Sequence, residues 1–319
     1  MSIAMLVFAG VAVAGATGAF FSDTETSTGN TFTAGAIDLT IDNHAWYNGN
    51  ECAHDDIDDR YEWQGSEAYP VPGTECSGTW ELSDLGDGHL FFELTDLKPG
   101  DWEEDTISIH VNDNDAWMCS TLTLTSDNEN SVTEPESEEA AEDDPLGDDT
   151  DNDTWDGELA SELNFIFWAD DGDNVLEMDE HVILSGTPED LKSNGVAVDR
   201  AGNEVSGGSS SPYFYGYAQR FPIADSTYSI LGDPGTPVTG SDNPADAIYI
   251  GKAFCYGAIT LDEVAAGNDN SPADDPGFDC NGQIVTNLTQ TDGITADMEF
   301  YAVQSRNNDT FECNPQTDA

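Results

Sequence analysis

The chain has 319 residues, of which 38% are hydrophobic and 10% aromatic, enough to bury the core of one large domain or two small ones. Its 65 Asp and Glu residues stand against 7 Lys and Arg, which gives a formal net charge of −58. No basic patch exists to meet phosphate groups, so the composition argues against nucleic acid as a partner.

The charge also indicates the solvent in which the protein works. At ordinary ionic strength, repulsion among so many carboxylates opposes a compact state. In molar salt the Debye length falls to about 3 Å and this repulsion is screened. Scarce lysine together with surplus carboxylate is typical of proteins from halophiles. We therefore interpret the acidic surface as the adaptation of a halophilic archaeon to salt.

The N-terminus carries an apolar run, IAMLVFAGVAVAGATGA at residues 3–19. It is short for a membrane span and ends in small residues, as the apolar region of a signal peptide does. No basic segment precedes it, which favours a start site assigned too far downstream, or else an uncleaved N-terminal anchor. We predict a signal peptide at 1–19 that is cleaved near Ala16 or Ala19, and a secreted, extracellular protein.

The next segment, residues 20–33, has the pattern of a β-strand. Thr24, Thr26 and Thr28 are β-branched and alternate with Asp, Glu and Ser, so that one face of the strand can dock against a surface. The residues alone leave two alternatives open. The segment is either the first strand of its own sheet or a strand that pairs elsewhere.

The rest of the chain predicts an all-β fold. Ile37, Leu39 and Ile41 alternate with polar residues, as in a half-buried strand, and similar runs recur to the C-terminus. One short helix is expected at 187–194, with Thr187 as its N-cap. We predict a single β-sandwich or jelly-roll domain over residues 34–319. Further strands are expected at 89–97, 105–113, 117–127, 163–171, 247–261 and 296–306.

Two insertions are expected on this domain. Residues 43–88 contain many Gly, Asp and aromatic residues and are predicted to be irregular. Residues 127–158 hold 15 Asp or Glu and no basic residue, so we expect a long, exposed acidic loop.

The six cysteines favour disulfides in an exported chain, and they allow fifteen pairings. Short loops favour the pairs Cys52–Cys76 and Cys255–Cys280, which leaves Cys119 for Cys313. N-x-T sequences at Asn152, Asn287 and Asn308 suit surface glycosylation.

One acidic stretch has the residues of a cation site, WADDGDNVLEMDEH at 168–181. Calcium prefers several hard oxygen ligands on a tight turn. The stretch therefore suggests a calcium cofactor, although a solvated acidic turn explains the same residues, and the EF-hand spacing is absent. The candidate ligands are Asp171, Asp173, Glu177 and Asp179.

Catalytic signatures are missing from the sequence. No HExxH, GxSxG, P-loop or GxGxxG motif occurs, and pairs of carboxylates are expected by chance in this composition. We therefore predict that the protein is not an enzyme.

Two stretches carry a resemblance to a known family. They are GAFFSDTETSTGNTFTAGAIDLTI at 18–41 and LTDLKPGDWEEDTISIHVND at 94–113. They resemble the TasA/camelysin family, the bacterial biofilm matrix proteins that are exported with a dedicated (SipW-type) signal peptidase. They also resemble the archaeal bundling pilins that are related to this family. The C-terminal stretch at 290–308 is similar to the last strand of haloarchaeal members. The matching positions are Ala19, Phe20, Asp23, Phe32, Ala34, Gly35, Leu39 and Leu97–Asp101.

The resemblance implies a function for the N-terminal strand. In such filaments it is a donor strand, which leaves its own subunit and completes the jelly roll of the next. We therefore expect a cell-surface filament of head-to-tail copies, with bundles of neighbouring filaments as a further possibility. The expected donor residues are Phe20, Phe21, Thr24, Thr26, Thr28 and Phe32.

Two other functions stay open. One is a monomeric, calcium-dependent cell-surface adhesin built on the acidic stretch. The other is a hydrolase, because some family members are described as metalloproteases.

Overall fold

The structure is a computed structural model that describes residues 37–85, 89, 91, 96–131, 133–136, 138, 155–241, 243–267 and 270–314. The predicted signal peptide (1–19), the predicted donor strand (20–33) and Asn152 lie outside the described residues.

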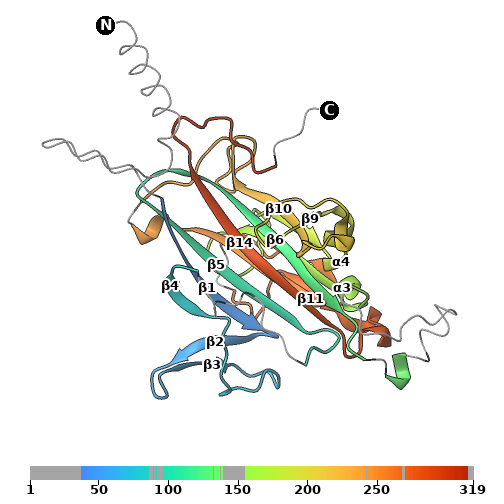
Figure 1. Ribbon diagram of the computed structural model, residues 1–319. Coiled ribbons are helices and arrows are strands. Elements are labelled where there is room, and N and C mark those ends of the chain that lie inside the picture. The colour runs from blue at the N-terminus through green and yellow to red at the C-terminus, as the bar shows by residue number, and fades with distance from the viewer. Residues whose placement is uncertain are drawn as a thin grey trace, which may run out of the picture.

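Two antiparallel sheets face each other and form the predicted all-β sandwich (Figure 1). The larger sheet has eight strands in the order β3-β2-β1-β5-β11-β7-β8, and β4 also pairs with β1. Its strands are β1 (Asp38–Tyr47), β2 (Asn50–Asp55), β3 (Arg60–Gln64), β4 (Trp80–Ser83), β5 (Trp102–Asn112), β7 (Leu163–Asp170), β8 (Val182–Gly186) and β11 (Ile248–Tyr256).

The smaller sheet has four strands in the order β14-β6-β10-β9. Successive long strands alternate between the sheets, since β5, β7 and β11 lie in the larger one and β6, β10 and β14 in the smaller. A separate hairpin joins β12 to β13. The bounds are β6 (Ala116–Asn128), β9 (Val196–Val198), β10 (Gly216–Ala224), β12 (Ala258–Leu261), β13 (Phe278–Asn281) and β14 (Gly293–Gln304).

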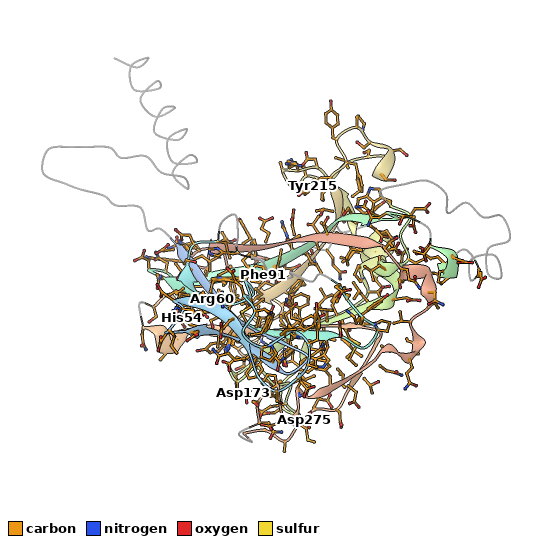
Figure 2. All side chains as sticks on the ribbon, turned by 90° about the horizontal axis from the view of Figure 1, so that it is seen from below. His54, Arg60, Phe91, Asp173, Tyr215 and Asp275 are labelled. Atoms are coloured by element: carbon orange, nitrogen blue, oxygen red, sulfur yellow. A yellow bond between two sulfur atoms is a disulfide. The ribbon has the colours of Figure 1, made fainter. Side chains whose placement is uncertain are left out.

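The main core lies between the sheets, where the period-two pattern points the apolar side chains. Ile107 and Ile109 of β5 face inward from the larger sheet, and Leu122 and Leu124 of β6 face them from the smaller. Figure 2 places Phe91 in this space between the two layers. The two sheets thus bury one continuous apolar layer, which is the main stabilising contribution in a sandwich.

A second, smaller core covers the outer face of the larger sheet. Ile166 and Trp168 of β7 point away from the main core and pack with Leu176 and Phe278. Trp168 lies directly over Gly251 of β11, where a Cβ atom would come within 1.9 Å of its indole ring. The loop at 171–181 therefore closes over this face and buries β5 on both sides.

The helices are short and lie near one end of the sandwich. α4 (Pro188–Asn194) begins at Thr187, whose side chain accepts from the Asp190 N–H while the Asp190 carboxylate accepts from the Thr187 N–H. This capping box confirms the predicted helix and its N-cap. α3 is a single turn, Leu159–Glu162.

The prediction that residues 43–88 are irregular was wrong for much of that segment. β1 continues to Tyr47, because Asn43, Ala45 and Tyr47 remain buried on one face. β2, β3 and β4 then pair onto the same sheet. The alternation of buried and exposed positions is hard to see in the sequence because some buried positions hold polar residues. Asn43 is one of them, and its side-chain amide donates a hydrogen bond to the Gly78 carbonyl.

Three disulfides join the six cysteines: Cys52–Cys76, Cys119–Cys313 and Cys255–Cys280. They are the pairs that the sequence favoured. Cys119–Cys313 spans 194 residues and ties the segment after β14 to β6. The strand β6 is thus held to the C-terminal part of the chain both by its ladder with β14 and by a covalent bond.

A buried lysine lies inside the sandwich. Lys252 of β11 is 0% exposed, and its ammonium contacts the Asp105 carboxylate and donates to the Phe91 carbonyl. The Glu103 carboxylate lies 3.6 Å away. The lysine therefore compensates two acidic side chains that β5 turns into the core.

Candidate functional site

A cavity of about 890 Å³ opens between the sheets near α3 and α4. Its walls are mainly apolar and come from β6, β7, β11 and α4. The segment at 286–296, which leads into β14, forms a polar rim. The apolar side chains include Leu122, Leu124, Leu163, Phe165, Leu191 and Phe254. The cavity is therefore a groove into the main core, with room for several side chains.

The first residues of β14, Gly293–Ala296, line this groove, and β14 forms one edge of the smaller sheet. Among the described residues, β14 pairs only with β6, so its other edge carries no strand. The inward side chains of β14 are more exposed to solvent than those of β6, the strand with which it pairs. Ala296 is exposed and Met298 half-buried, whereas their partners Leu124 and Leu122 are 0% and 3% exposed. The core is thus incompletely covered along this edge.

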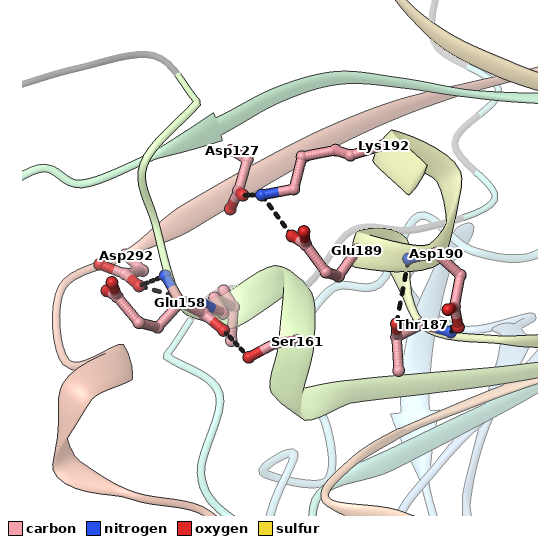
Figure 3. A network of polar contacts seen from close by, with 9 residues as sticks. Asp127, Glu158, Ser161, Thr187, Glu189, Asp190, Lys192 and Asp292 are labelled. Atoms are coloured by element: carbon pink, nitrogen blue, oxygen red, sulfur yellow. Dashed lines mark hydrogen bonds and ion pairs between the residues drawn. The ribbon is translucent and has the colours of Figure 1, made fainter. Parts of the chain in front are cut away.

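Polar contacts hold the walls of the groove in place (Figure 3). The Asp292 carboxylate accepts the backbone N–H groups of Glu158 and Leu159 at the start of α3, at 2.8 and 3.0 Å. Lys192 of α4 donates to Asp127 of β6 at 2.6 Å and also pairs with Glu189. α3 and α4 are thereby tied to the two strands of the smaller sheet that border the groove.

An acidic group lies at the rim. One carboxylate oxygen from each of Glu129, Glu136 and Asp292 lies within 4.8 Å of the others. Burial, followed by the charge of Asp292, raises the pKa of Glu129 to about 8. Burial likewise raises the pKa of Asp292 to about 6. Asp127, at the start of the expected acidic loop, is also buried rather than solvated, and Lys192 compensates it.

The predicted calcium ligands separate into two sets. Asp171 and Asp173 lie together and are joined by Asp170, with one oxygen of each within 4.8 Å of the others. Glu177 is turned away, because its carboxylate accepts the Gly267 N–H at 2.7 Å. Asp179 is exposed to solvent.

The two described glycosylation candidates differ in setting. Asn287 is exposed at the groove rim, where its side-chain oxygen accepts from Gln290. Asn308 is half-buried, and its carbonyl accepts the Trp117 indole N–H at 2.8 Å.

The expected donor residues lie outside the described residues, and the sequence did not predict the groove that stands beside β14.

Three acidic groups in the described part of the chain have the spacing of a cation site, and none includes a histidine. None of the described helices has the length and apolar character that a membrane span needs.

Comparison with known protein families gives a match at the N-terminus. The model of a family described as camelysin metallo-endopeptidase matches residues 1–61, which include the predicted signal peptide, the predicted donor strand and β1. No curated protein matches the chain. The resemblance to the TasA/camelysin family that residues 18–41 carry is therefore confirmed for the N-terminal segment, residues 1–61.

Proposed function

We propose that this chain is the structural subunit of an extracellular filament, a pilus or biofilm-matrix fibre. In this proposal, residues 20–33 of one subunit occupy the groove beside β14 of the next. The observation that carries the proposal is the apolar groove of about 890 Å³ beside an edge of β14 that pairs with no other strand in the described part of the chain. The family match supports it, because the TasA/camelysin family includes extracellular fibre subunits and the match covers this segment.

The chemistry of the two surfaces is complementary. An added strand gains main-chain hydrogen bonds from an exposed edge, and its alternate side chains enter pockets of the acceptor. β14 offers such an edge, and Leu124, Leu163 and Phe254 offer apolar walls. In the donor segment, Phe20, Phe21 and Phe32 supply the anchors, and the alternating threonines supply a strand-forming stretch.

The geometry of such an exchange leads to fibres. A segment that leaves one subunit and docks on a different surface of the next makes a heterologous contact, which continues without closing. Signal cleavage would free the donor segment outside the cell. The net charge of −58 per subunit opposes association, so assembly is expected to need high salt.

The name of the matched family raises the question of proteolysis. A zinc protease uses histidine ligands together with a glutamate base. The described acidic groups contain no histidine, so the proposal gives this chain no catalytic role.

The proposal is tested with a peptide of residues 19–33 and a chain that lacks them. In molar KCl, the labelled peptide is expected to bind the truncated protein in a 1:1 ratio. An Ala296→Trp substitution, which places a large ring in the groove from an exposed position, is expected to abolish binding. Glu299→Trp is the matched control, because Glu299 is exposed on the outward face of the same strand. Absence of binding to the truncated protein, or equal loss in both variants, would contradict the proposal.

A further inference from the structure

The outer face of the larger sheet buries carboxylates that no basic residue compensates. Glu104 of β5 is 0% exposed, and neither of its carboxylate oxygens has a hydrogen-bond partner among the residues that the structure describes. The buried Oδ1 of Asp170 has none either. All seven Lys and Arg residues lie among the described residues, and none of their ion pairs reaches these two side chains. Burying a carboxylate without a compensating charge, or without its hydrogen bonds, is strongly unfavourable.

Glu104 points toward the acidic turn that covers this face. It lies on the same side of β5 as Thr106, whose hydroxyl reaches the turn at Asp170 and Asn174. Burial raises the pKa of Glu104 well above its usual range, and among the neighbouring charges Asp170 adds most to this effect. Asp170, Asp171 and Asp173 converge, with one oxygen of each within 4.8 Å of the others. Figure 2 shows Asp173 outside the sandwich on this side.

The contacts of Thr106 are unusual for a hydroxyl. Its Oγ1 lies 2.8 Å from Oδ2 of Asp170 and 2.7 Å from Oδ1 of Asn174. A hydroxyl has one proton, so it donates to only one of these acceptors at a time. The amide of Asn174 keeps its oxygen toward Thr106 because its nitrogen donates to the His44 carbonyl. An excess of oxygen acceptors over protons is the arrangement that a bound cation satisfies.

We propose that a calcium ion binds between the outer face of β5 and the turn at 170–174. Calcium fits better than magnesium, because it accepts six to eight oxygen ligands in flexible geometry, whereas magnesium demands a near-ideal octahedron and retains several waters. The ligands are side-chain oxygens of Glu104, Asp170, Asp171, Asp173 and Asn174.

The loop is already built to hold these ligands. Glu180 accepts the backbone N–H groups of Asp171 and Glu177, at 2.8 and 2.9 Å, and so fixes the turn from its far side. Glu180 is therefore a positioning residue. Because Leu176 packs in the outer core, a cation would fasten this loop, and the outer core beneath it, onto the sheet.

The site is tested by terbium luminescence on the mature, full-length protein in molar KCl. Trp168 lies fully buried on the same face, so excitation of tryptophan is expected to sensitise bound Tb³⁺, and Ca²⁺ is expected to displace it. Calcium is also expected to raise the melting temperature of chelator-treated protein. Glu104→Gln should weaken binding by at least about tenfold, while Asp179→Asn, in the same loop but exposed, should leave it unchanged.

Melting in chelator shows whether the weaker binding of Glu104→Gln comes from a lost metal ligand or from a destabilised fold. Glu104→Gln removes an uncompensated charge, so in chelator it should melt no lower than the wild type. If it does not fold, Asp173→Asn, whose side chain is only half-buried, makes the same test. No sensitised luminescence in the wild type, or equal affinity in the wild type and Glu104→Gln, would overturn the proposal. Displacement by Mg²⁺ as effective as by Ca²⁺ would overturn the assignment to calcium. The readout concerns each subunit and does not depend on filament assembly.

Discussion

Replacement of Lys252 by Met removes the lysine that contacts the buried acidic pair of β5, Glu103 and Asp105. The lysine is 0% exposed and contacts Asp105, with Glu103 3.6 Å away. Met fills much of the space of the lysine stem, so the packing changes little. What is lost is the charge that compensates the two carboxylates.

The size of the effect follows from burial. Removal of one partner of a buried ion pair costs about 3–5 kcal/mol, because it leaves an unpaired charge inside the protein. Since the free energy of unfolding of a domain is about 5–15 kcal/mol, this is a large fraction of the total. Burial raises the pKa of Asp105, and Lys252 is the main influence that lowers it. Without the lysine this pKa rises further, so the folded variant takes up a proton as pH falls, and its deficit should shrink at acidic pH.

Urea denaturation in molar KCl at pH 5 and pH 8 measures this deficit. Lys98→Met is the matched control, because the ion pair of Lys98 with Asp96 is exposed, so its loss should change the free energy of unfolding far less than the loss of Lys252. If the two variants lose equal stability, or if the deficit of Lys252→Met is the same at both pH values, the lysine does not compensate buried charge and the reasoning fails.

Three further predictions concern stability. The double substitution Cys119→Ser and Cys313→Ser opens a loop of 194 residues. It should lower the free energy of unfolding, measured by urea denaturation, by about 5 kcal/mol, because the unfolded chain gains the entropy of the open loop. A loss under about 1 kcal/mol would contradict this argument. Glu129, whose pKa is raised to about 8, holds a proton in the folded state that the unfolded chain releases. The melting temperature in chelator should therefore fall from pH 5 to pH 8, and less steeply in Glu129→Gln; identical slopes would refute this. Dilution of KCl from molar to about 0.1 M lengthens the Debye length to about 10 Å and should lower the melting temperature, whereas an unchanged value would remove the basis for a salt adaptation.

The strands were predictable where burial is one-sided. In β5, Ile107 and Ile109 alternate with Ser108 and His110. This period of two predicts a strand with one face toward the core of the sandwich. The helix at α4 was equally readable, because a cap and a proline mark its start within two residues. Both features depend on neighbours in the sequence, which is why the pattern contains them.

The candidate sites depend on residues far apart in the chain. Within the described ranges, β14 lies beside β6 with no further strand on its other side, and no local sequence pattern indicates a missing neighbour. The sequence pattern did not indicate a role for Glu104, for a similar reason. It lies 66 positions before Asp170 in the sequence, and only the pairing of β5 and β7 with β11 brings them to one face. Three consecutive acidic residues at 103–105, followed directly by the alternating pattern of a half-buried strand, were the available signal.

The measurement that tests the central claim most directly is electron microscopy of the mature protein in molar KCl, beside a chain that lacks residues 19–33 and beside Ala296→Trp. Fibres are expected from the mature protein and from the Glu299→Trp control, and dispersed subunits are expected from the truncated chain and from Ala296→Trp. Fibres from the truncated chain, or dispersed subunits from the intact one, would contradict the claim that the N-terminal segment joins one subunit to the groove of the next.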